Sequence, residues 1–169
     1  MNAAQRREQI LAYLQETAQP LSASALAGKL SVSRQIIVGD VALLRAAGAG
    51  ITATPRGYVL ERPRAGVTGT VACLHGREDM ERELTLVVDQ GCIVENVIVE
   101  HPVYGQLTGA LELSSRYDIA EFIRRVEKYS ARPLSQLTDG IHLHTLRCPS
   151  QDALDRAVAA LREAGFLAQ

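Results

Sequence analysis

The chain has 169 residues, of which 47% are hydrophobic and 22% charged, and this balance excludes an intrinsically disordered chain. There is no run of about 18 apolar residues, so no membrane span is expected. The charged N-terminal residues lack the apolar core of a secretion signal, so we expect a cytoplasmic protein. This length suits one large domain or two small ones.

The net charge of −1 conceals a difference between the two parts of the chain. Residues 1–64 carry eight basic and four acidic side chains, whereas the remainder carries ten basic and fifteen acidic ones. Such asymmetry is expected when one half meets nucleic-acid phosphates and the other does not. Because surface charge also varies without function, it counts here as a supporting observation only.

The three cysteines, Cys73, Cys92 and Cys148, are widely spaced and lie in apolar surroundings. An odd number without a Cys-x-x-Cys pair is not typical of a disulfide framework or a zinc ribbon. We therefore expect all three to be reduced thiols in the core of a cytosolic protein.

Residues 1–64 show the pattern of three helices followed by a β-hairpin. Apolar residues recur at helical spacing, serines stand at the N-cap positions of the second and third helices, and Gly48 follows the third. The expected helices lie at residues 6–17, 23–30 and 34–47, and the expected strands at residues 51–54 and 57–60. This order predicts a winged helix-turn-helix domain over residues 1–64.

A polar segment with Pro63 and Gly66 marks the boundary to a second domain, residues 65–169. Its expected strands lie at residues 67–74, 93–100, 106–113 and 134–146, and its helices at residues 78–89, 115–130 and 150–164. The order β-α-β-β-α-β-α predicts an antiparallel sheet covered by helices on one face. The fold class of the whole chain is therefore α+β.

The start of the third helix carries the candidate DNA-reading residues, Ser33, Arg34 and Gln35. In a helix-turn-helix these positions reach base edges, where Arg can bond guanine and Gln adenine. Arg56, at the turn of the hairpin, suits a wing that touches phosphate or the minor groove. Each residue could also be an ordinary solvated side chain, but the complete element order in the basic part of the chain favours double-stranded DNA. A homodimer is expected because such proteins usually read two half-sites.

Histidines form the second candidate site. His142 and His144 are two apart, so on a strand both point to the same face, and His75 stands at the end of the first strand of this domain. Neutral imidazoles with a carboxylate bind first-row divalent metals, with Zn, Ni, Fe and Mn all allowed. A single histidine is more often structural, but three meeting at adjacent strand ends would indicate a metal site.

These residues lie in strings that carry a family resemblance over nearly the whole chain. The strings are Ser31-Val32-Ser33-Arg34-Gln35, Leu74-His75-Gly76, His101-Pro102-Val103-Tyr104-Gly105 and Asp139-Gly140-Ile141-His142-Leu143-His144-Thr145. The first occurs in many winged-helix regulators, whereas the last two are specific. The chain resembles the niacin-responsive repressors of NAD biosynthesis, which join a winged helix-turn-helix to a 3H domain.

The resemblance implies a divalent transition metal, one per chain, bound by His75, Glu83, His142 and His144. Glu78 and Glu81 are nearby acids that compete with Glu83 for this role. It also implies that nicotinic acid or a related niacin compound is the co-repressor, with its carboxylate or pyridine nitrogen at an open metal position. In this reading His101 and Tyr104 line the effector pocket, although His101 could instead cap a strand end.

Two other functions are compatible with such a site. A metalloenzyme could use an exchangeable metal position to activate water or oxygen, although no second base or nucleophile accompanies the histidines. The attached DNA-binding domain makes sensing the simpler role, so we do not expect an enzyme. A repressor could also respond to the metal itself.

Overall fold

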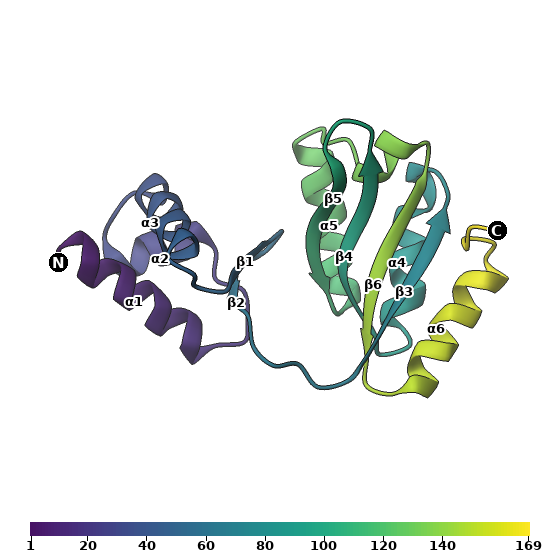
Figure 1. Cartoon of the computed structure of the whole chain (residues 1–169), viewed down its shortest axis with the longest axis horizontal. Helices are drawn as coiled ribbons and strands as arrows, with labels where there is room; N and C mark the ends of the chain where they lie inside the picture. Colours follow the sequence, from purple (N-terminus) through teal and green to yellow (C-terminus); the bar gives the residue numbers. More distant parts are fainter. The chain divides into compact units, whose positions relative to one another are not determined.

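In the computed structural model, which describes all residues from 1 to 169, the chain divides into two units, Met1–Pro63 and Arg64–Gln169. Each unit has a hydrophobic core of its own. None of the helices has the length and apolar character needed to cross a membrane. Figure 1 shows the course of the chain through both units.

The first unit contains the three expected helices and the expected hairpin. Its elements are α1 (Ala3–Glu16), α2 (Ala23–Leu30), α3 (Arg34–Ala46), β1 (Ile51–Thr54) and β2 (Gly57–Leu60). The Ser22 and Ser33 side chains accept hydrogen bonds from backbone N–H groups in the first turns of α2 and α3, which explains where these helices begin. The prediction of three helices and a wing is confirmed.

Apolar side chains from the three helices meet in one core, which includes Ile10, Leu26 and Ile37, each fully buried. A buried carboxylate also holds α3 against α1. Asp40 of α3 lies 2.5 Å from Nε of Arg6 and 3.5 Å from Nη1 of Arg7. The orientation of α3 therefore depends on ion pairs as well as on packing.

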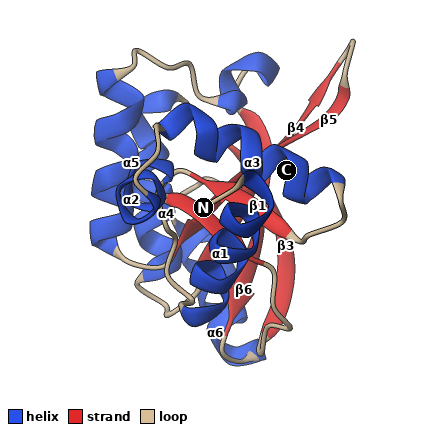
Figure 2. Cartoon of the chain, turned by 90° about the vertical axis from the view of Figure 1, so that its left-hand side faces the viewer, coloured by secondary structure: helices blue, strands red, loops and turns tan.

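The second unit is a four-stranded antiparallel sheet with helices on one face (Figures 1 and 2). Its strands are β3 (Val67–Leu74), β4 (Ile93–His101), β5 (Gly105–Leu113) and β6 (Ile141–Cys148), in the spatial order β3-β6-β4-β5. The helices are α4 (Met80–Val88), α5 (Arg116–Lys128) and α6 (Gln151–Glu163). Side chains from all three helices share one core with the sheet, so its other face carries no helix. The predicted α+β class is confirmed.

The sequence prediction of a strand from residue 134 is wrong for the first seven residues. Leu134–Thr138 form the short 3-10 helix η2, and β6 begins only at Ile141. Asp139 and Gly140 have φ values of 52° and 96°, which no β-strand accommodates. The positive φ values therefore delay the strand until after Gly140.

The C-terminal residues extend the sheet at its β3 edge. The Leu74 N–H donates to the Phe166 carbonyl at 2.8 Å, and the Ala168 N–H donates to the Ala72 carbonyl at 2.9 Å. This backbone pairing was not predicted from the sequence. It closes one edge of the sheet and places Phe166 beside the end of β3.

The expectation of three separate thiols is wrong for Cys92 and Cys148, which form a disulfide; Cys73 is free and buried. Ile93 of β4 pairs with Arg147 of β6, so the residues just outside this pair also face each other. Their Cα atoms lie 4.2 Å apart. The sequence hides this proximity because 56 positions separate the two cysteines.

Thiol titration tests this pairing. Protein denatured without reductant should react as one free thiol per chain, and protein denatured after reduction as three. Closing a loop of this length stabilises a fold by up to about 4 kcal/mol, so Cys92→Ser should lower the free energy of unfolding in urea. Cys73→Ser should leave the disulfide intact. Three reactive thiols in the unreduced protein would contradict the pairing.

Candidate metal centre and nucleic-acid interface

Three histidines and one glutamate converge between the sheet and α4. His142 and His144 of β6 point to the helix-covered face, His75 follows β3, and Glu83 comes from the first turns of α4. Only 1% of Glu83, 4% of His142 and 3% of His144 is exposed. The structure thus brings together the four residues that the resemblance implied, and Glu83 rather than Glu78 or Glu81 is the acid among them.

The Nε2 atoms of all three histidines surround the Glu83 carboxylate. The Nε2 to oxygen distances are 2.7 Å for His75, 3.1 Å for His142 and 3.3 Å for His144. Two residues on one strand, one at the end of the neighbouring strand and one on a helix therefore meet within hydrogen-bond range of a single side chain.

The other ring nitrogen of each histidine lies next to a backbone carbonyl. Nδ1 of His75 lies 2.8 Å from the Gly76 oxygen, that of His142 2.8 Å from the Gly140 oxygen, and that of His144 2.6 Å from the Asn96 oxygen. A carbonyl only accepts, so each Nδ1 donates its proton. In the neutral imidazole the Nε2 lone pair is then directed to the common centre, as in histidines that bind metals.

The donor set fits a divalent metal ion. With the proton on Nδ1, the buried Nε2 atoms of His75 and His144 face Glu83 oxygens, which also only accept, so neither makes a hydrogen bond; this is costly inside a protein. Cys73 adds a sulfur atom: one ligand atom from each of Cys73, Glu83 and His142 lies within 4.8 Å of the others. This buried group could hold a metal, and imidazole, carboxylate and thiolate are all ligands of zinc and related ions.

The electrostatics of the cluster make a proton and a metal ion competitors. Burial would raise the pKa of Glu83, but the three imidazoles around it outweigh burial and hold it far below its usual range. Burial lowers the pKa of His75, but the Glu83 carboxylate beside it leaves the net pKa raised. Because Nδ1 already holds a proton, protonation occurs at Nε2. This is the atom that a metal would need.

The sign of each pKa shift gives its effect on the metal-free fold. The raised pKa of His75 stabilises the fold below about pH 6.5, and this contribution is lost as the pH rises through the raised value. The lowered pKa of Glu83 stabilises the fold above about pH 4.3, and that contribution is lost as the pH falls. The two contributions to stability are therefore fully present together only between about pH 4.3 and 6.5.

Neighbouring residues hold the ligands in place. The Phe166 ring packs against the His75 ring with centroids 5.1 Å apart, and the Arg82 guanidinium lies over the Phe166 ring, 5.3 Å from its centroid. Gly140 cannot be replaced easily, because a Cβ there would lie 2.5 Å from the His75 carbonyl oxygen. The C-terminal residues that pair with β3 and the turn before β6 therefore both position His75.

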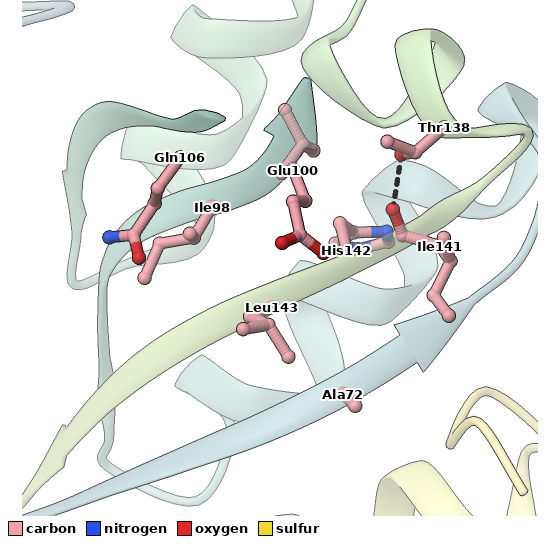
Figure 3. A pocket seen from close by; sticks show the side chains of 9 residues that line it. Ala72, Ile98, Glu100, Gln106, Thr138, Ile141, His142 and Leu143 are labelled. Atoms are coloured by element: carbon pink, nitrogen blue, oxygen red, sulfur yellow. Dashed lines mark hydrogen bonds between the residues drawn. The ribbon is translucent and has the colours of Figure 1, made fainter. Parts of the chain in front are cut away.

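His101 and Tyr104 lie apart from this cluster, at the turn between β4 and β5. The His101 Nδ1 atom accepts hydrogen bonds from the Val103 and Tyr104 N–H groups at 3.1 and 3.2 Å, and the Tyr104 side chain is 74% exposed. His101 thus shapes the turn. A hollow of about 340 Å³ near this turn is lined by Ile98, Glu100, Gln106, Ile141 and Leu143 among others, but by neither His101 nor Tyr104 (Figure 3).

The start of α3 presents the predicted DNA-reading residues. Ser33, Arg34 and Gln35 are exposed, and the Ser33 side chain accepts from the Ile36 N–H at 3.3 Å. Arg56 lies at the turn of the β1–β2 hairpin and is half-buried. Arg6 and Arg7 contribute less free positive charge than the sequence indicated, because both contact Asp40.

Comparisons with known proteins match both units. Residues 6–59 match the HTH domain family and residues 68–169 match the 3H domain family. The chain is 46% identical over 168 residues to the transcription repressor NadR of Bacillus subtilis, an alignment that covers 97% of this chain and 93% of the relative. It is 42% identical over 163 residues to the probable transcription repressor NiaR of Thermotoga maritima, with 96% and 93% covered.

The chain belongs to the NadR/NiaR family of transcription repressors. Its full-length relatives are named repressors and not enzymes, so the metalloenzyme alternative is not supported. The helix-turn-helix of a repressor family implies that the first unit binds DNA.

Three residues at this cluster, Cys73, Asn96 and Phe166, were missed in the sequence analysis. Cys73 lies in β3, two positions before His75. Because side chains two apart on a strand point to the same face, this spacing was a signal for placing Cys73 beside His75. Asn96 binds His144 through its carbonyl oxygen and the Thr145 N–H through its side chain. Phe166 had no local signal, because only the pairing of the C-terminal residues with β3 brings it to His75.

Metal analysis tests the four-residue centre. The purified protein should carry about one divalent ion per chain, and the double variant His142→Ala with His144→Ala should carry none, because it loses two of three imidazoles. His101→Ala is the matched control, since it removes the fourth histidine of the chain from outside the cluster.

The pH dependence of metal content gives a second readout. Metal should be released between about pH 6.5 and 5 as protons occupy the imidazoles. Full metal in the double variant, or loss of metal in His101→Ala, would show that the ion binds elsewhere.

Proposed function

We propose that this chain is a niacin-responsive repressor that binds double-stranded operator DNA as a homodimer and controls genes of NAD biosynthesis or niacin uptake in the cytoplasm. The observation that carries the proposal is the buried cluster of three imidazole Nε2 atoms around Glu83, joined to a helix-turn-helix. Three imidazoles and a carboxylate can bind a divalent metal ion, and a regulator needs a site that binds its effector.

One divalent transition metal would be held by His75, Glu83, His142 and His144, and Zn, Ni, Fe and Mn all accept this donor set. When bound, the ion supplies a positive charge and an exchangeable position that a carboxylate or a pyridine nitrogen can occupy. The protein keeps the three imidazoles oriented through their Nδ1 contacts to backbone carbonyls.

We propose that nicotinic acid binds beside the ion, in a hollow of about 370 Å³. The residues that line it are His75, Gly76, Arg77, Glu78, Ser135, Gln136, Asp139 and Gly140, so Arg77 is its one basic side chain besides His75. Arg77 is exposed at this hollow, and its guanidinium can pair with a carboxylate in two parallel hydrogen bonds. Nicotinic acid has both a carboxylate and a pyridine nitrogen, so it can use the metal and Arg77 together.

Regulation requires that the effector distinguish two arrangements of the protein. A ligand with equal affinity for both arrangements does not shift the equilibrium between them. As a co-repressor, nicotinic acid must therefore bind more tightly to the arrangement that binds operator. A typical coupling of about 1–3 kcal/mol would raise operator affinity roughly five- to hundred-fold.

The DNA-reading helix is tested by substitution at its exposed start. Arg34→Ala and Gln35→Ala should each weaken specific operator binding by about 1–3 kcal/mol without changing the fold. Arg56→Ala should instead lower affinity for all sequences and reduce the dependence of binding on salt. Fluorescence anisotropy with operator and scrambled duplexes at several salt concentrations separates the two effects. Unchanged operator affinity in all three variants would show that α3 is not the reading helix.

The sensor is tested by the reciprocity of the two bindings. On metal-loaded protein, nicotinic acid should tighten operator binding and operator should tighten nicotinic acid binding by the same factor. Metal-stripped protein should lose the response but keep weak, salt-sensitive DNA binding. Arg77→Gln should weaken nicotinic acid binding with metal content unchanged, and nicotinamide, which lacks the carboxylate, serves as the control ligand.

Calorimetry measures the affinity for nicotinic acid with and without operator, and fluorescence anisotropy measures the affinity for operator with and without nicotinic acid. Equal affinity for nicotinic acid with and without operator would contradict the sensor. A response to metal alone, with no further effect of nicotinic acid, would show a metal-responsive repressor instead.

A further inference from the structure

The turn between β4 and β5 presents apolar side chains to solvent. Val103 is 78% exposed and Tyr104 is 74% exposed, and Figure 2 shows this hairpin extending beyond the rest of the sheet. The two hydrogen bonds to the His101 Nδ1 atom and the packing of the Tyr104 ring against the His101 ring, with centroids 5.1 Å apart, hold the turn in shape. We call residues 101–104 the hairpin tip.

The helix-free face of the sheet is apolar at the same end. The strand registers pair Leu143 with Ala72 on one side and with Ile98 on the other, and pair Leu74 with Ile141. Leu74 is 49% exposed, Ile141 48% and Leu143 37%. We call these five residues the open face. Four of them, Ala72, Ile98, Ile141 and Leu143, line the hollow of about 340 Å³ in Figure 3, and Leu74 lies beside them as the strand partner of Ile141.

The other end of this face carries charges that balance one another. Arg147 lies 2.7 Å from Glu95 and 3.4 Å from Glu112, and Arg64 lies 3.2 Å from Glu95 and 2.5 Å from Glu112. A patch with both signs next to each other is self-complementary under a two-fold axis, whereas a patch of one sign would repel its own copy.

The dimensions of the face also suit a second copy. Four strands of eight or nine residues cover about 19 by 26 Å, or about 500 Å² for each copy taken as a flat rectangle. Stable interfaces bury about 600–1,000 Å² for each partner. The face alone falls just short of this range, and the hairpin tip supplies the additional apolar area.

We propose that two copies of this chain pair through their helix-free sheet faces, with the hairpin tip of each copy seated on the open face of the other. The inference rests on the homodimer proposed above and names its surface. It accounts for the exposed apolar residues at the tip and on the face with a single contact. It also brings His101 and Tyr104 of one copy to the sheet that carries the metal centre of the other.

The test is the mass of the metal-loaded chain in solution without DNA, by sedimentation equilibrium. The wild type should have twice the chain mass of 18.3 kDa. Tyr104→Asp at the tip and Leu143→Asp on the face should each raise the dimer dissociation constant by about thirty-fold or more, since each buries an unpaired charge in the contact. Tyr117→Asp is the matched control, because Tyr117 is 71% exposed but lies on α5, on the helix-covered side.

Cysteine pairs test the exchange of tips directly. Tyr104→Cys chains mixed with Leu143→Cys chains should form an intermolecular disulfide under mild oxidation, and neither variant should do so alone. Metal content is measured on every variant, so loss of the fold or of the metal centre is recognised separately. Because the Tyr104 side chain is 74% exposed on a turn, its variant carries the test even if Leu143→Asp does not fold.

Each other outcome overturns the proposal in a distinguishable way. A dimer that tolerates Tyr104→Asp and Leu143→Asp would place the contact elsewhere and leave the proposed repressor dimer intact. A wild-type monomer would contradict both the surface and the homodimer. Crosslinking of Tyr104→Cys chains alone would show that the tips meet each other and not the sheet.

Discussion

A carboxylate buried at the centre of the second unit determines how that unit is arranged. Glu83 is 1% exposed, and an isolated charge at such a place would cost several kcal/mol. Three imidazoles compensate it, and they come from two strands, whereas Glu83 comes from α4. The position of α4 on the sheet, the turn at Gly140 and the pairing of the C-terminal residues beside β3 all serve to keep these four side chains together.

The first unit also contains a buried carboxylate, but different residues compensate its charge. Asp40 is also buried in the helical unit, but it contacts the guanidinium groups of Arg6 and Arg7, and guanidinium is a permanent charge in proteins. Its compensation is therefore constant. Glu83 faces imidazoles, whose charge depends on pH and on metal. The first unit therefore holds α3 with charges that do not change, whereas the charge at the centre of the second unit can change, as a regulated repressor requires.

The elements of the chain were predictable to the extent that their signals are local. Ser22 and Ser33 mark helix starts, Gly48 follows α3 with a positive φ, and runs of β-branched residues mark β3 and β4. The prediction failed at residues 134–140, because Leu134–Thr138 form η2, which packs against β4, and Asp139 and Gly140 have positive φ values. It failed for Cys92 and Cys148 because only the register of β4 with β6 brings them together.

By itself the sequence determined the two units, the exposed start of the reading helix and the identity of the histidines, since caps, periodicity and short strings are local properties. Only the tertiary structure decided which acid joins the histidines, because Glu78, Glu81 and Glu83 lie on one short segment and only Glu83 points inward from α4. It also placed Cys73, Asn96 and Phe166 at the cluster and put His101 and Tyr104 on a projecting turn. The physical reason is that a buried site is made by strand order and register, and these depend on contacts between residues far apart in the chain.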